Sequence, residues 1–358
     1  MRSAVAAMGT EAARDAEGTV PNPFYPDKPL SGDEGPGLFR GRESTVREIE
    51  EILADSNRAV SLQLLAPRRA GKTSLLKMLP DMAPDSIFVF FDLQAHPVST
   101  VESFWNKLSK EAVVQAKLTR RVALPPLPPN LPPMEAGAAW LELLDTLPDR
   151  RKVLIAIDEF ERLEDLFPGS RREFLQLMGL FRATIQHRRN VRLLVSGAAP
   201  FEELDGVWDD HFISVRRVKL PFLDEPTSIG LLAAGAIGAE VARAVYRRTG
   251  GQPYLLQIFG HLLITRLNET KRQTCIAADV EAVESAAIEW AQAYFGDTYR
   301  HAPPGAQQAL IALAQGEAIN PDAATRRWLA YRQLLTVDGG LAVPLFGAWM
   351  HHHGWVPA

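Results

Sequence analysis

The residues with the clearest chemistry form one run of eight, Ala66-Pro67-Arg68-Arg69-Ala70-Gly71-Lys72-Thr73. The run follows an apolar, strand-like segment over 59–65 and opens a helix-like segment that starts at Ser74. A short loop that turns into a helix offers backbone N–H groups and the positive end of the helix dipole to an anion. Lys72 would add a cation for β- and γ-phosphates, and Thr73 a hydroxyl for Mg²⁺. The sequence therefore predicts nucleotide contacts from Ala66 to Ser74.

The first position of this run departs from the usual pattern G-x-x-x-x-G-K-[ST], because Ala66 stands where a glycine is expected. Alanine still lets the backbone approach a ligand closely, but it gives up easy access to positive φ. We interpret Ala66 as a tolerated variant, since the strand, the Gly71-Lys72-Thr73 core and the helix are intact. The alternatives are a chance Gly-Lys-Thr in a turn and a scaffold that has lost catalysis.

A second candidate site lies at the end of the apolar run 152–157, where Asp158 and Glu159 follow. A charge at the tip of a buried strand is costly unless it faces Mg²⁺ or its waters. Glu159 would orient or deprotonate the water that attacks a γ-phosphate. The alternative is that both acids cap a following helix over 160–166. The order of the two motifs favours a catalytic set of Lys72, Asp158 and Glu159, with Thr73 and Asp158 as Mg²⁺ ligands.

Other polar residues have two interpretations each. Ser196 ends a fourth apolar strand, where it would sense the γ-phosphate or serve only structure. Arg216 and Arg217 would act on the nucleotide of a neighbouring subunit, or form a solvated basic edge. Arg68 and Arg69 would contact phosphate or hold neighbouring acids.

The elements that must position these residues alternate along the chain. Apolar strands are predicted at 59–65, 87–93, 152–157 and 191–197, and helices at 98–117, 136–147 and 172–187, with an extended proline-rich loop over 124–133. Such alternation predicts an α/β fold with a parallel sheet covered by helices on both faces. We expect the sheet domain to span residues 21–222, after a disordered tail over 1–20.

After residue 222 the sequence is alanine-rich and has the spacing of helices, which predicts an all-helical lid domain over 223–300. Helices near 305–314 and 322–335 follow, and Asp338-Gly339 then separates two apolar runs, which is a hairpin signal. Helices followed by a hairpin predict a small winged-helix domain over 301–358.

Composition bounds the class of protein. The 358 residues carry a net charge of −4, which argues against a globally basic nucleic-acid binder. The single cysteine, Cys275, excludes internal disulfides and fits a reducing cytosol. No apolar stretch approaches the ~20 residues that span a bilayer, and the N-terminus lacks a secretory apolar region. We therefore predict a cytoplasmic protein without a membrane partner. The run His351-His352-His353 near the C-terminus is interpreted as a solvated tail.

The chain resembles the archaeal-type and STAND branch of AAA+-related P-loop ATPases, where STAND denotes signal-transduction ATPases with numerous domains. The resemblance covers roughly residues 22–265. It rests on Asn22-Pro23-Phe24, Leu38-Phe39-Arg40-Gly41-Arg42-Glu43, the loop 67–76, Ile157-Asp158-Glu159-Phe160-Glu161, Ser196-Gly197 and Gly250-Gly251-Gln252-Pro253-Tyr254-Leu255-Leu256. The terminal residues also resemble the winged-helix ends that are common in this group.

The resemblance implies an AAA+-like P-loop NTPase core, with ATP and Mg²⁺ as ligands. It implies that Phe39 and Arg42 line the adenine side, and that Gln252 and Pro253 begin a lid helix with the proline against the base or ribose. Many relatives have a histidine in place of Gln252. The implied function is a slow ATPase switch that signals through a protein partner or self-association; the alternative is a DNA-binding initiator or loader that uses the winged helix.

Overall fold

The computed structural model describes residues 19–31, 37–55, 60–82, 86–164, 167 and 170–355. The chain divides into two compact units. The sheet unit comprises residues 30–36 and 42–220, and the helical unit comprises residues 1–29, 37–41 and 221–358. Most of the predicted N-terminal tail, residues 1–18, lies outside the described residues.

The sheet unit is built on five parallel strands in the order β2-β3-β4-β1-β5. Their bounds are β1 Leu62–Leu65, β2 Ser86–Asp92, β3 Lys152–Asp158, β4 Val191–Gly197 and β5 Arg216–Lys219. The predicted parallel α/β core is confirmed. Strand β4 lies between β1 and β3, so the carboxyl ends of these three strands meet at one edge of the sheet.

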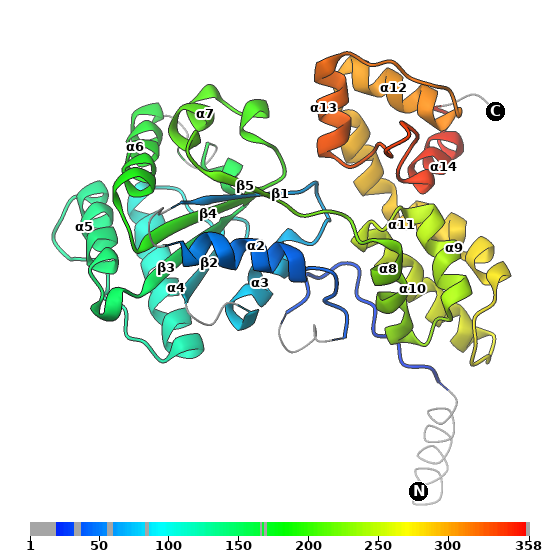
Figure 1. The fold of residues 1–358 in the computed structure, drawn as a ribbon, viewed down its shortest axis with the longest axis horizontal. Coiled ribbons are helices and arrows are strands. Elements are labelled where there is room, and N and C mark those ends of the chain that lie inside the picture. The colour runs from blue at the N-terminus through cyan, green and yellow to red at the C-terminus, as the bar shows by residue number, and fades with distance from the viewer. Residues whose placement is uncertain are drawn as a thin grey trace, which may run out of the picture. The chain divides into compact units, whose positions relative to one another are not determined.

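Helices cover both faces of this sheet (Figure 1). The connection from β1 to β2 runs in the opposite direction to those that lead from β2 to β3 and from β3 to β4, and right-handed crossovers therefore place the helices on opposite faces. One face carries α2 (Glu43–Ala54) and α3 (Lys72–Met82); the other carries α4 (Val101–Arg120), α5 (Pro133–Asp145), α6 (Arg171–His187) and α7 (Gly206–Phe212). Burial on both sides explains why the strands read as continuous apolar runs.

The second face holds a large apolar core. Alternate residues of β2, β3 and β4 point into it, including Phe91, Ile155 and Leu193. Aromatic rings from the helices fill the layer, and Phe104 and Trp105 of α4 pack edge to face with centroids 5.0 Å apart. This core fixes the strands whose ends carry the candidate site.

Two local predictions in the sheet unit need correction. Strand β5 was not expected, because it is a short basic edge strand in which only Val218 is buried. The helix predicted over 160–166 is instead a short 3₁₀ helix, η2 (Phe160–Leu163), and Leu166 lies outside the described residues. The other short 3₁₀ helices of this unit are η1 (Pro148–Arg150) and η3 (Phe201–Glu203).

The helical unit contains eight helices among the described residues. They are α8 (Glu225–Leu232), η4 (Ala233–Gly235), α9 (Ala239–Thr249), α10 (Pro253–Glu269), α11 (Ala277–Arg300), α12 (Pro304–Ala314), α13 (Ala323–Tyr331) and α14 (Pro344–His352). Helix α14 packs on α9, α11 and α12. The ring of Phe295 in α11 lies 5.1 Å from that of Phe346 and 5.8 Å from that of Trp349, both in α14. The terminal helices therefore share a core with α9 and α11.

The end of the chain differs in detail from the prediction. The hairpin expected after α13 is represented, within the described residues, by a single antiparallel bridge between Leu335 and Leu341. Helix α14 was not predicted, and it includes His351 and His352. The histidine run is therefore a helix end rather than a tail, although its side chains are exposed. Every helix in the described ranges is too short or too polar to cross a membrane.

A segment near the N-terminus, residues 20–25, belongs to the helical unit, and we call it the strap. The Val20 N–H donates to Asn268 Oδ1 (2.8 Å), and the Tyr25 N–H donates to Gln257 Oε1 (3.2 Å). Phe24 between them is fully buried. A Cβ placed on Gly235 or Gly260 would lie 2.4 or 2.7 Å from the Phe24 ring, so only glycine leaves room for it.

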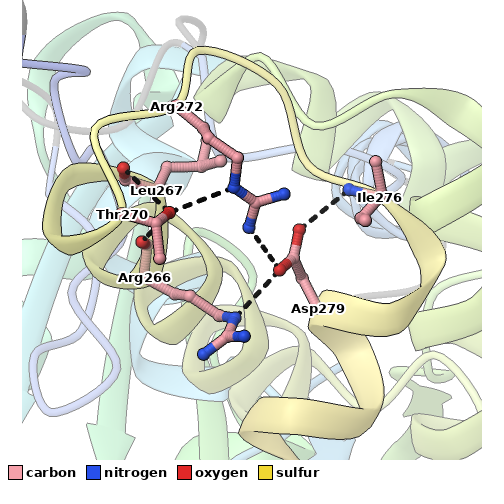
Figure 2. A network of polar contacts seen from close by, with 6 residues as sticks. All are labelled: Arg266, Leu267, Thr270, Arg272, Ile276 and Asp279. Atoms are coloured by element: carbon pink, nitrogen blue, oxygen red, sulfur yellow. Dashed lines mark hydrogen bonds and ion pairs between the residues drawn. The ribbon is translucent and has the colours of Figure 1, made fainter.

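A polar network closes the connection between α10 and α11 (Figure 2). Buried Asp279 accepts hydrogen bonds from Arg266 Nε (2.9 Å), Arg272 Nη2 (2.5 Å) and the Ile276 N–H (2.9 Å). Burial raises the pKa of Asp279, but the hydrogen bonds from Arg272, Ile276 and Arg266 outweigh it and lower the pKa to about 2. The carboxylate therefore holds the start of α11 against the end of α10.

Candidate active site

The phosphate loop of residues 66–71 joins β1 to α3 and has two residues at positive φ. These are Arg69 (φ 61°) and Gly71 (φ 93°), in the region that favours glycine. Ala66 is buried and does not adopt positive φ. The departure from glycine at this position therefore costs the loop no backbone strain, since the demand for conformational freedom falls on Gly71.

Lys72 begins α3, and its side chain turns back over the loop. Its Nζ donates to the carbonyl oxygens of Ala66 (2.8 Å) and Pro67 (3.1 Å), and the side chain is buried. Burial lowers the pKa of Lys72, and the carboxylates of Glu159 and Asp158 oppose that effect. The ammonium group is thus held at the loop by two carbonyls and by nearby negative charge.

Thr73 and Asp158 meet across the sheet edge. The Thr73 hydroxyl donates to Asp158 Oδ2 at 2.6 Å, although the two residues are 85 positions apart. Asp158 is buried, and its Oδ1 has no hydrogen-bond partner among the described residues. A hydroxyl and a carboxylate are hard oxygen donors, and Mg²⁺ binds through one or two such groups while it keeps several waters. The residues present therefore fit this ion.

Ser196 lies between the two halves of the site. The strand register pairs it with Asp158 on one side and with Leu64 of β1 on the other. Its side chain is fully buried, and its hydroxyl has no partner in the described part of the chain. Since buried polar groups are nearly always satisfied, such an orphan hydroxyl points to a polar ligand.

Glu159 follows Asp158 and has a left-handed backbone, with φ 55°. Burial is the main cause that raises its pKa to about 7, and the carboxylates of Glu161 and Asp158 add to the effect while Lys72 opposes it. The edge formed by the ends of β1, β3 and β4 thus gathers five residues that the sequence analysis singled out, and their roles stay predictions: Lys72, Thr73, Asp158, Glu159 and Ser196.

Glu161 is a further acid of this region to which the sequence assigned no role. Its Oε1 accepts the Ala198 N–H at 2.8 Å, and its Oε2 is buried without a partner among the described residues. A Cβ on Gly197 would lie 2.0 Å from that Oε2. The carboxylate therefore ties η2 to the end of β4, next to Ser196. The only sequence signal was its place in the run Asp158-Glu159-Phe160-Glu161.

The remaining predicted residues of the loop differ in exposure. Arg68 and Arg69 are exposed, and Ser74 is buried, where its Oγ accepts the Leu30 N–H at 3.1 Å. Arg42 is buried, and its Nη2 donates to the Ala70 carbonyl at 3.0 Å. Arg42 therefore contacts the main chain of the loop itself.

Several predicted residues lie outside this cluster. Phe39, Gln252 and Pro253 belong to the helical unit, where buried Gln252 caps α10 by accepting the Leu255 N–H at 2.8 Å. Their contacts to a base or ribose stay predictions. Arg216 and Arg217 lie on β5, where they form exposed ion pairs with Glu48 (3.7 Å) and Glu202 (2.5 Å).

Comparison with known families supports this description of the sheet unit. Residues 57–204 match the model of the family described as AAA domain. This stretch contains the phosphate loop, Asp158 and Ser196, and the sheet unit has the parallel-sheet, AAA+-like P-loop fold. No curated protein sequence matches the chain significantly.

Solved structures share the architecture over most of the chain. The Walker-type ATPase PABY2304 of Pyrococcus abyssi matches with a TM-score of 0.64 and 17% identity, covering 91% of this chain and 99% of that one. The ORC2 protein of Aeropyrum pernix, in its ADPNP–ADP complexes, matches with a TM-score of 0.52 and 12% identity, covering 92% of this chain and 89% of that one. At these identities the likeness establishes the fold.

Proposed function

We propose that this chain binds ATP with Mg²⁺ in the phosphate loop, hydrolyses it slowly, and acts as a nucleotide-dependent signalling switch. One observation carries the proposal: Lys72, Thr73 and Asp158 converge at the ends of β1 and β3, beside buried oxygens that have no hydrogen-bond partner among the described residues. An acid that only capped a helix would accept hydrogen bonds from backbone N–H groups, whereas Asp158 Oδ1 accepts none from the part of the chain that the structure describes.

Each residue of the cluster has a role in phosphoryl transfer to water. Backbone N–H groups of the loop and Lys72 would hold the β- and γ-phosphates, and Thr73 and Asp158 would hold Mg²⁺ or its waters. The ion, when bound, neutralises charge on the phosphate oxygens. Glu159 would orient the attacking water, and Ser196 would donate to a γ-phosphate oxygen from the end of β4.

We expect slow turnover of a single chain because hydrolysis by such sites is fast only when an arginine reaches the transition state. An arginine supplied to the transition state contributes roughly 10³–10⁵ in rate. Arg216 and Arg217 are each paired with an acid of the same unit. We therefore propose that rapid hydrolysis needs a partner or a second copy of the chain, and that this association is the output of the switch.

Calorimetry with ATP and Mg²⁺ tests the binding step. Lys72→Ala should abolish binding, whereas Lys77→Ala, a lysine one turn and a half further along α3, should leave it unchanged. Glu159→Gln should bind ATP and retain it without releasing phosphate. A wild-type protein that binds neither ATP nor ADP would contradict the proposal.

A second candidate function is a DNA-binding initiator or loader. The observation that favours it is the surface of α13, which exposes Arg326 and Arg327 while Trp328 and Leu329 are buried. Phosphate contacts release counterions, so duplex binding through this helix should weaken steeply with salt. The test is a gel shift at several salt concentrations, with Arg326→Ala and Arg327→Ala as variants. Indifference to DNA at low salt would leave the switch as the function.

A further inference from the structure

Three of the four points at which the chain passes between the units involve residues that bond to the phosphate loop or its flanks. The chain passes between the units after residues 29, 36, 41 and 220. Three residues at these crossings bond to the segment 65–74: the Leu30 N–H donates to Ser74 Oγ, Arg42 Nη2 to the Ala70 carbonyl, and the Leu220 N–H to the Leu65 carbonyl (3.1, 3.0 and 2.9 Å). The fourth crossing involves residue 36, which lies outside the described residues.

Arg42 is the one of these three whose contact depends on its side chain. It is the first residue of the sheet unit after 37–41, it stands at the N-cap of α2, and only 4% of it is exposed. Burial lowers the pKa of Arg42 to about 10, so the guanidinium is charged at neutral pH. A charged donor on a carbonyl makes a stronger hydrogen bond than a neutral one.

The geometry of the peptide bond shows what this hydrogen bond controls. Ala70 C=O and Gly71 N–H belong to the same planar trans peptide, so they point in opposite directions. Arg42 holds the carbonyl, and a Cβ on Gly71 would lie 3.7 Å from Arg42 Nη2. The Gly71 N–H is therefore directed away from Arg42, and an oriented N–H in a loop that starts a helix is a phosphate donor.

We propose that Arg42 is a positioning residue for phosphate: it fixes the Ala70–Gly71 peptide so that the Gly71 N–H faces the bound phosphates, and it links the occupied loop to residues 37–41. The role differs from the adenine contact that the family resemblance implies for Arg42. The inference rests on the proposed nucleotide site. It adds that the Arg42 side chain orients a backbone donor of that site, and that residues 37–41 respond when phosphate binds.

Inorganic tripolyphosphate separates the two roles, because it has phosphates and no base. Calorimetry with Mg²⁺ should show that Arg42→Gln weakens ATP, GTP and tripolyphosphate by the same factor, about tenfold or more, since a hydrogen bond to a charged group is lost. Arg42→Lys keeps a charged donor and should recover most of the affinity for all three.

Arg192→Gln is the matched control. Arg192 is also buried and also donates to carbonyls of the α2 region, Ile52 at 2.7 Å and Asp55 at 2.9 Å, at the opposite end of that helix. Arg192→Gln should lower the stability of the protein about as much as Arg42→Gln does, and it should leave the affinity for tripolyphosphate unchanged. If Arg42→Gln does not fold, Arg42→Lys must show the smaller residual loss of affinity, and that loss must be the same for the three ligands.

Hydrogen exchange tests the link to the connecting residues. Saturating tripolyphosphate should slow exchange over 37–41 in the wild type and not in Arg42→Gln. The proposal is overturned if Arg42→Gln or Arg42→Lys weakens ATP alone, if Arg42→Gln leaves all three affinities unchanged, or if exchange over 37–41 responds equally in both proteins or in neither. A wild type that binds none of the three ligands would instead refute the nucleotide site itself.

Discussion

At the scale of single residues, the phosphate loop is shaped by two backbone positions. Gly71 has φ 93°, a backbone conformation that costs glycine little free energy. Arg69 has φ 61°, which costs a residue with a side chain about 1 kcal/mol or more. Ala66 carries no such penalty. The strain in this loop is therefore located at Arg69, next to the expected phosphates, and not at the position where the motif is irregular.

Restoring the expected glycine should accordingly bring no gain. Ala66→Gly should lower the free energy of unfolding by about 0.4–1 kcal/mol, because glycine adds freedom to the unfolded chain. Its dissociation constant for ATP should stay within about twofold of wild type, which corresponds to a few tenths of a kcal/mol. Calorimetry and urea unfolding measure both quantities. A large gain in affinity or in phosphate release would show that Ala66 had impaired the loop.

Most of the cluster could be predicted from sequence because its members lie at or just beyond the ends of apolar strands. Asp158 and Ser196 lie at the ends of β3 and β4, Lys72 and Thr73 begin the helix after the β1 loop, and parallel strands end at one edge. The tertiary contact of Glu161 could not be predicted, since its partner is the backbone N–H of Ala198. A backbone group leaves no residue type in the sequence to recognise.

At the scale of elements, β2, β3 and β4 could be predicted from sequence because strands buried on both faces are continuous apolar runs. Strand β5 has three exposed residues out of four and is basic, so it resembles a loop in sequence. It forms because β1 offers an open edge with which it can pair in parallel register. Helix α14 was missed because the histidine run at 351–353 was interpreted as a solvated tail, whereas Phe346 and Trp349 pack on α11.

The junction of α10 and α11 gives a prediction at this scale. Asp279→Asn should lower the free energy of unfolding by about 2–3 kcal/mol at pH 7, because it removes a buried charge that three donors stabilise. The folded pKa of Asp279, about 2, lies below the unfolded value near 3.9. Its stabilisation is therefore present above pH 4 and is lost as the pH falls from about 4 to 2.

Urea unfolding of wild type and Asp279→Asn at pH 7, 4 and 3 measures this dependence. The difference between the two proteins should shrink at the lowest pH. A difference that stayed constant across this range would mean that the side chain acts through packing rather than charge.

At the scale of the whole molecule, the chain divides into two compact units. The parallel sheet could be predicted because its strands and helices alternate along the chain, whereas the domain bounds 21–222, 223–300 and 301–358 stay predictions. The helical unit was harder, since the strap that completes it comes from the other end of the sequence. Phe24 packs at Gly235 and Gly260, and neither the apolar pattern nor the spacing of glycines indicates such a pairing.

Truncation of this ring should destabilise one unit selectively. Phe24→Ala should lower the stability of the helical unit by about 3–5 kcal/mol, since the backbone of two glycines cannot fill the cavity. Tyr25→Ala is the matched control: that side chain is 54% exposed, and the change should stay within about 0.5 kcal/mol. Hydrogen exchange resolved along the chain reports each unit. Equal losses in β3 and α10, or equal effects of the two variants, would contradict the assignment.

The position of the strap in the sequence also sets an order of assembly during translation. Its anchors on α10, Gln257, His261 and Asn268, are 232–248 residues further along the chain. All five strands of the sheet are therefore synthesised before α10, the helix to which residues 20–25 bind. A nascent chain arrested after residue 220 should expose Phe24 to proteases or chaperones, and completion of α10 should end that exposure.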